Sequence, residues 1–112
     1  EHRLMSGRAR VRISDEGQRI LRAVMPAAAE VVAATQVPTS RPGWNEADLP
    51  FETPDYSARQ LLRLGADVEV LAPDALRDAV LREARAVAAL YRRAVPVGPT
   101  LTSVKVGPPG LG

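Results

Sequence analysis

The chain has 112 residues, enough for one domain with one hydrophobic core, and a formal net charge of only +2 from 15 Lys and Arg against 13 Asp and Glu. It has no cysteine and one histidine, His2, which excludes disulfides and thiolate chemistry and argues against a histidine-centred catalytic or metal site. No segment approaches the apolar length needed to cross a bilayer, so we expect no membrane partner. With no cysteine and a single histidine, we also expect no metal and no cofactor.

The first predicted strand covers residues 8–13, after a lead-in or linker at residues 1–7. Its sequence, RARVRI, alternates strictly between apolar and basic side chains. This pattern places Ala9, Val11 and Ile13 on one face of a sheet and the three arginines on the other. We therefore expect the apolar side chains to enter the core.

A helix is predicted to follow, with Ser14 or Asp15 as its N-cap and Asp15 with Gln18 at the spacing of a capping box. Its apolar stripe consists of Ile20, Leu21, Val24 and Met25.

Pro26 allows two interpretations, because a proline inside a helix removes a hydrogen bond and clashes with the preceding turn. Either the helix kinks and continues through Ala34, or it ends near Met25. We prefer the end, which leaves residues 30–36, EVVAATQ, for a second strand. Alanine-rich runs also form helices readily, so helix and strand both stay open for residues 27–36.

A third strand is predicted at residues 44–52, WNEADLPFE, after a loop at residues 38–43. The pattern places one set of side chains on the core face: Asn45, Ala47, Leu49 and Phe51. The opposite set is Trp44, Glu46, Asp48, Pro50 and Glu52. Pro50 cannot donate a ladder hydrogen bond, so we expect it at an edge or a bulge.

Residues 54–64 are predicted to form the second helix, with Thr53 as N-cap and Pro54 at the first helical position. Gly65 would end this helix in the left-handed conformation. Residues 67–71, DVEVL, then alternate as a half-buried strand with its valines inward.

A third helix is predicted at residues 74–93, with an apolar stripe of Leu76, Val80, Ala84, Val87 and Tyr91. Residues 94–112 are rich in Pro and Gly and indicate an irregular tail, in which residues 101–106, LTSVKV, could pair with a sheet edge. The order of elements predicts an α+β domain at residues 8–93. Its fold would be ferredoxin-like, βαββαβ, with a four-stranded antiparallel sheet and an additional C-terminal helix.

The stretch from residue 64 to residue 91 also resembles a known family. Residues 64–73, LGADVEVLAP, are followed by Leu76-Arg77 and an alanine-rich helix that ends in Tyr91. This arrangement resembles the C-terminal extension, or WCX domain, of WYL-domain transcriptional regulators. The residues that carry the fold signature are Gly65, Val68, Val70, Pro73 and Leu76. The resemblance extends back to residue 8 and leaves out the tail.

This resemblance implies the same ferredoxin-like fold and a regulatory role in a bacterial cytoplasmic protein. The implied partners are the WYL domain of the same parent chain and a second copy in a homodimer, with a contribution to effector sensing. DNA would be bound only by a helix-turn-helix of the parent, which these residues do not include.

Residues for catalysis are sparse. The serines lie at caps, in loops or at a helix start without a base nearby, and no glycine-rich phosphate cradle is present. Asp67 and Glu69 share a strand face at the separation of a carboxylate pair, and we interpret them as part of a solvated surface. We therefore expect no enzyme.

Arg8, Arg10 and Arg12 form the strongest candidate for ligand or nucleic-acid contact, because guanidinium groups along an open sheet can hold phosphates. In the predicted fold, however, the first strand lies between the third and the fourth. Five acidic side chains would then face the row: Glu46, Asp48, Glu52, Asp67 and Glu69. Cross-strand ion pairing is our preferred interpretation. The alternative function is a stand-alone module that binds a small ligand or single-stranded nucleic acid on its open sheet face.

Candidate partner contacts are Trp44 and the stripe of the third helix, represented by Val80, Val87 and Tyr91. Trp44 begins a strand and could anchor a partner or cover the edge of the core. We expect the third helix to contact a partner, because two helices already cover one sheet face in this fold.

Overall fold

The computed structural model describes residues 7–94, and the predictions for residues 1–6 and for the tail, including residues 101–106, lie outside this range. The described elements, in chain order, are β1 (Gly7–Ser14), α1 (Asp15–Val24), α2 (Pro26–Thr35), β2 (Val37–Pro38), β3 (Trp44–Phe51), α3 (Pro54–Leu61), the 3-10 helix η1 (Leu62–Asp67), β4 (Val68–Ala72) and α4 (Asp74–Ala94). Among these residues, no helix combines the length and apolar character that a membrane span requires.

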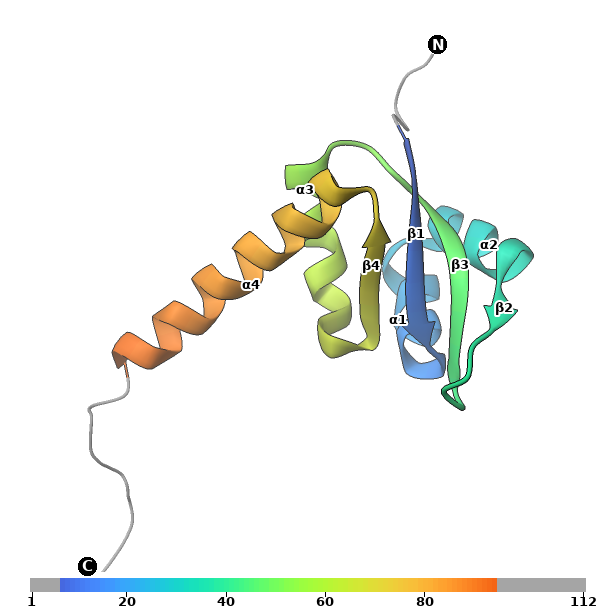
Figure 1. Cartoon of the computed structure of the whole chain (residues 1–112), viewed down its shortest axis with the longest axis horizontal. Coiled ribbons are helices and arrows are strands. Elements are labelled where there is room, and N and C mark those ends of the chain that lie inside the picture. Colours follow the sequence, from blue (N-terminus) through green and yellow to red (C-terminus); the bar gives the residue numbers. More distant parts are fainter. Residues whose placement is uncertain (1–6, 95–112) are drawn as a thin grey trace, which may run out of the picture.

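The four strands form one antiparallel sheet in the order β2-β3-β1-β4 (Figure 1). This arrangement confirms the predicted mixed α+β class and four-stranded antiparallel sheet. β1 pairs with β3 along its whole length, with Arg10 opposite Asp48. β2 pairs only with Asn45 and Glu46, so beyond these two residues β3 has no neighbouring strand on that side. Pro50 therefore lies at an edge, where its missing N–H leaves no ladder bond unmade.

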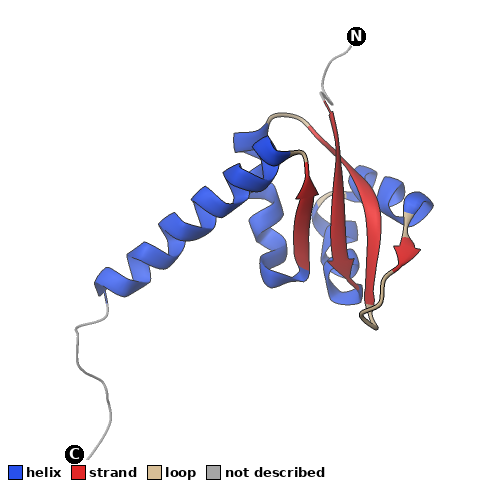
Figure 2. Cartoon of the chain, viewed as in Figure 1, coloured by secondary structure: helices blue, strands red, loops and turns tan. Residues whose placement is uncertain are grey.

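The core lies between the sheet and the helices behind it (Figure 2). The apolar side chains of the strands enter the core as predicted, and the buried ones are Ala9, Val11, Ile13, Ala47, Leu49, Phe51 and Val70. Pro50, predicted on the opposite face, is buried as well. The helices contribute Leu21, Ala28, Val32, Leu61, Leu64 and Leu76 to the same cluster. Ile20, Val24, Met25 and Val68 are half-buried against it.

The predicted second strand at residues 30–36 is wrong. The first helix does end at Val24, as preferred, but Pro26 starts a new helix that runs to Thr35. Proline suits this first position because its missing N–H would be unbonded there anyway, and the alanines that follow favour helix. Between α1 and β3, only Val37–Pro38 form a strand. One predicted helix and one predicted strand are therefore replaced by two helices and a two-residue strand.

The start of α1 is capped by Ser14, whose Oγ accepts a hydrogen bond from the Gly17 N–H at 2.9 Å. Of the two predicted N-cap residues, Ser14 and Asp15, the structure therefore has Ser14 as the cap. The predicted capping box of Asp15 and Gln18 does not form it. Thr53 caps α3 as expected, with Pro54 at the first position. The predicted helix at residues 54–64 ends earlier, at Leu61, and the 3-10 helix η1 connects it to β4. Gly65 lies inside η1 with a φ of +60° and a ψ of −129°, so it does not end α3 in the predicted left-handed helical conformation.

The signature residues of the predicted strand-helix unit are all structural. Val70 and Leu76 are buried, Val68 packs against the core, and Pro73 joins β4 to α4. From Pro73, α4 passes along α3 and then extends beyond the sheet and the other helices (Figure 1). The end of this helix therefore has little cover from its own domain.

Candidate functional site

The arginine row of β1 lies on the sheet face opposite the helices. Arg10 lies between two carboxylates of β3: its Nε donates to Glu46 Oε2 at 2.7 Å and its Nη1 donates to Asp48 Oδ1 at 2.9 Å. These hydrogen bonds, first from Glu46 and then from Asp48, raise the pKa of Arg10 above its ordinary value. The charge of Arg10 is therefore matched within the sheet.

The outer members of the row are paired more loosely. Arg8 Nη1 lies 3.5 Å from Asp48 Oδ2, and Arg12 Nη1 lies 3.6 Å from Glu69 Oε1. Of the other predicted partners, Asp67 turns away and accepts a hydrogen bond from Ser14 Oγ at 2.8 Å. Arg8 and Arg12 keep 59% and 48% of their side-chain surface exposed, so they offer more to a ligand than Arg10 does.

Trp44 is half-buried at the start of β3 and is not part of the core cluster. The guanidinium of Arg41 lies over its ring, 4.4 Å from the centroid, in a cation–π contact that the sequence did not predict. The two side chains border an open, largely polar hollow of about 340 Å³ on the open sheet face. Its other lining residues are Arg12, Pro38, Thr39, Ser40, Glu46 and Glu69.

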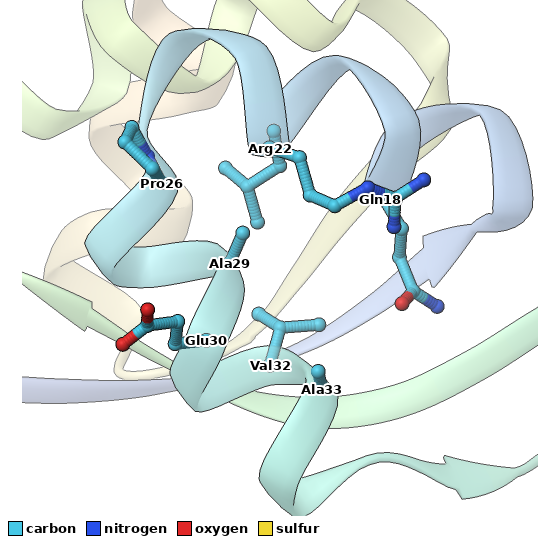
Figure 3. Close-up of a pocket in the computed structure, with 8 residues that line it drawn as sticks. Gln18, Arg22, Pro26, Ala29, Glu30, Val32 and Ala33 are labelled. Atoms are coloured by element: carbon cyan, nitrogen blue, oxygen red, sulfur yellow. The ribbon is translucent and has the colours of Figure 1, made fainter.

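A second, more apolar groove of about 300 Å³ lies between α1 and α2 (Figure 3). Leu21, Ala29 and Val32 form its apolar part. Gln18 and Arg22 line it from α1, and Glu30 lines it from α2. Such a groove can accept an apolar side chain from a partner, but it gathers no reactive groups.

The predicted stripe of α4 changes from buried to exposed along the helix. Leu76 is fully buried and Val80 packs against the core. Val87, Leu90 and Tyr91 are 45%, 58% and 69% exposed. We refer to residues 84–92 as the distal segment and to these three side chains as its apolar ridge.

The proximal part of α4 is held by α3. Arg82 Nη2 lies 2.9 Å from Asp55 Oδ1, and Arg59 Nε lies 3.6 Å from Glu83 Oε2. Since α3 spans eight residues and α4 spans 21, the shorter helix cannot cover the longer one. Leu90 was missed as a candidate, although it continues the alternating spacing of four and three residues from Leu76 through Val80, Glu83 and Val87.

The buried serines have structural roles. Ser14 caps α1, and Ser57 Oγ accepts a hydrogen bond from the Glu52 N–H at 3.1 Å. Within residues 7–94, no group of three or more His, Asp or Glu side chains could hold a metal ion. The surfaces best suited to function are therefore the open sheet face and the distal segment.

Comparison with known protein families gives one result. The family model described as WCX domain matches residues 6–88, a span that runs from the start of β1 into α4. No curated protein and no solved structure matches the chain. Most of α4 lies inside the matched span, whereas Leu90 and Tyr91 lie just beyond it.

Proposed function

The chain belongs to the WCX domain family, as residues 64–91 predicted, and from this premise we propose that it is the C-terminal regulatory domain of a WYL-family transcriptional regulator. It contacts the WYL domain of its parent chain, supports the parent's homodimer and contributes to effector sensing. DNA is bound by a helix-turn-helix of the parent, in the cytoplasm of a bacterium. The role is non-catalytic and needs no cofactor.

One observation carries this proposal: the apolar stripe of α4 continues beyond the part of the helix that the domain itself buries. The same helical face is fully buried at Leu76 and mostly exposed at Tyr91. Burying a Val, Leu or similar side chain contributes about 1.5–3 kcal/mol, so three such side chains can supply much of the energy of a domain contact. A helix end without tertiary contacts is also prone to fray, and a partner would stabilise it.

The strand order supports a further part of the proposal, that the fold is a variant of the ferredoxin-like type. A central β1 flanked by β3 and β4, with β2 outside β3, is the order expected for that arrangement. The variation lies in the first crossover, where α1 and α2 stand in place of one helix.

Titration of the chain with the parent's separately expressed WYL domain tests the proposed function. Isothermal titration calorimetry should detect binding by the wild-type chain. The double substitution Leu90→Ser with Tyr91→Ser should weaken this binding by about tenfold or more, because it removes two side chains of the apolar ridge.

The matched control is Tyr56→Ser, which removes a 54% exposed aromatic side chain from α3 instead of α4. It should leave the affinity unchanged. Absence of binding by the wild-type chain, or equal weakening by the control, would contradict the proposed contact.

A second candidate function is favoured by the hollow beside Trp44. Two guanidinium groups and an aromatic ring border it beside Glu46 and Glu69, and the ring with the guanidinium groups can stack a base or contact a phosphate of a single-stranded nucleic acid. Fluorescence anisotropy with a short labelled oligonucleotide tests this function. Salt-sensitive binding that Arg12→Glu with Arg41→Glu abolishes would support it, and no binding would exclude it for that probe.

A further inference from the structure

The hollow beside Trp44 is closed on one side by a loop that hydrogen bonds hold in place. Thr39 Oγ1 donates to the carbonyl oxygen of Trp44 at 2.8 Å, and the Trp44 N–H donates to the carbonyl oxygen of Arg41 at 3.1 Å. The N–H of Asp15 donates to the carbonyl oxygen of Gly43 at 3.0 Å, which ties the same loop to the start of α1. A site that is formed before its ligand arrives loses little entropy when the ligand binds.

Four charged side chains line the hollow, and three of them already have a partner of opposite charge. Glu46 Oε2 accepts a hydrogen bond from Arg10 at 2.7 Å, and Arg12 Nη1 lies 3.6 Å from Glu69 Oε1. Within the described residues, Arg41 forms no ion pair, and its guanidinium lies over the neighbouring indole ring. The hollow therefore holds one positive charge that the domain does not neutralise.

A strand of nucleic acid is a poor match for this charge balance. Its phosphates repeat along the chain, so a strand that continues from the hollow across the sheet would pass the carboxylates of Asp48 and Glu69. Asp48 pairs with Arg10 at 2.9 Å and with Arg8 at 3.5 Å, so these arginines of β1 are matched as well. A single anionic group fits one unmatched guanidinium, whereas a polyanion needs several.

The unmatched charge lies beside an aromatic ring. The Arg41 guanidinium is 4.4 Å from the ring centroid of Trp44. A guanidinium can stack on an aromatic face and donate its in-plane N–H groups to an anion at the same time. A carboxylate carries one charge and fits this planar fork, whereas a phosphate monoester carries nearly two charges. The volume of about 340 Å³ lies within the range of small-molecule pockets.

We propose that the hollow beside Trp44 binds a small aromatic carboxylate. The ring of the ligand packs against Trp44, and its carboxylate accepts hydrogen bonds from the guanidinium of Arg41. This inference rests on the proposed function, because it gives a chemical class to the effector that the domain helps to sense. It also separates the role of Arg41 from that of the paired arginines of β1.

NMR titration of the full chain with naphthoate tests the inference, because Trp44 is the only tryptophan and its indole N–H gives a single signal. We expect this signal to shift and to saturate with a Kd of about 1 mM, as is typical of a ligand of this size. Two probes separate the parts of the ligand. Cyclohexanecarboxylate keeps the charge without the aromatic ring, and naphthylmethanol keeps the ring without the charge. Each should bind about tenfold or more weakly than naphthoate.

The variant Arg41→Gln should bind naphthoate about tenfold or more weakly, because it removes the charged partner of the carboxylate. Arg41→Lys keeps the charge and should recover part of the affinity, which a loss caused by a disrupted loop would not show. The matched control is Arg22→Gln on α1, which also removes an arginine without an ion pair in the described residues. It should bind within about twofold of wild type.

The outcomes separate this inference from the proposed function. If naphthoate causes no saturable shift, or if Arg22→Gln weakens binding as much as Arg41→Gln, the inference is overturned, while binding of the WYL domain would still support the proposed function. If naphthoate binds as expected and the WYL domain does not, the ligand site stands and the proposed contact fails. Tighter binding of a short oligonucleotide at the same signal would place a polyanion in the hollow and overturn the inference.

Discussion

Gly17 lies in the first turn of α1, where the helix passes close to the chain just before β4. A Cβ at this position would lie 2.5 Å from the carbonyl oxygen of Asp67 and 2.8 Å from Cγ1 of Ile13. Both distances are far shorter than a normal contact, and one of the two neighbours is backbone that cannot rotate away. Ser14 links the same two segments, because its Oγ accepts a hydrogen bond from the Gly17 N–H and donates one to Asp67 Oδ1.

We predict that Gly17→Ala destabilises the domain by about 1–3 kcal/mol, as expected for overpacking of a close contact. Gly65→Ala is the comparison, because nothing lies within 4 Å of its Cβ position and only its φ of +60° opposes the change. That variant should lose about 1–3 kcal/mol from backbone strain alone, because residues with a Cβ rarely adopt the φ of +60° and ψ of −129° found at Gly65. Urea denaturation measures both, and an unchanged midpoint for Gly17→Ala would refute the close approach.

The arginines of β1 are paired unequally, so replacing them should lower the stability of the domain by different amounts. Replacing Arg10 with Gln removes the partner of two carboxylates, whereas Arg12→Gln removes a single pair at 3.6 Å. We predict that the thermal midpoint falls more for Arg10→Gln than for Arg12→Gln. Differential scanning calorimetry checks the order, and the reverse order would contradict the pairing described for the open face.

At the scale of elements, α2 is where sequence reasoning failed. Residues 30–36 contain Val31, Val32 and Thr35, which suit a strand. Pro26 at the first helical position and the alanine run stabilise a helix instead, and Val32 still reaches the core. Local pattern could not decide this, because the burial of Val32 against β3 is a tertiary contact.

The helix also compensates for the short β2. Thr35 Oγ1 accepts a hydrogen bond from the Asp48 N–H at 2.9 Å, at a point where β3 has no strand beside it. We predict that Thr35→Val, which keeps the shape and removes the acceptor, costs about 1 kcal/mol because this half-buried amide loses its partner. Thr35→Ser should keep most of the stability. Equal denaturation midpoints for Thr35→Val and wild type would show that the bond contributes nothing.

For the whole molecule, the strand alternation and the order of β1, β3 and β4 could be predicted because charge and apolar patterns of period two fix both faces of a sheet. The pairing of Arg10 with Glu46 and Asp48 followed from that order. The stripe of α4 could also be predicted, but its exposure could not. Exposure depends on where α3 stops, and η1 shortens that helix to Pro54–Leu61.

The difference in length between α3 and α4 leaves the end of α4 uncovered. At 1.5 Å per residue, α3 is about 12 Å long and α4 is about 31 Å long, so the end of α4 extends well past its cover. The projecting end is too apolar to be explained by solvation alone, with Val87, Leu90 and Tyr91 on one face. We interpret it as a surface completed by another domain.

Hydrogen–deuterium exchange of the chain, alone and with the parent's WYL domain, tests whether another domain completes this surface. In the free chain, backbone amides of residues 84–92 should exchange faster than those of the buried part of α4, because only the latter are held by α3. Addition of the WYL domain should protect residues 84–92. Protection confined to β1 and β3, with the distal segment unchanged, would contradict the claim.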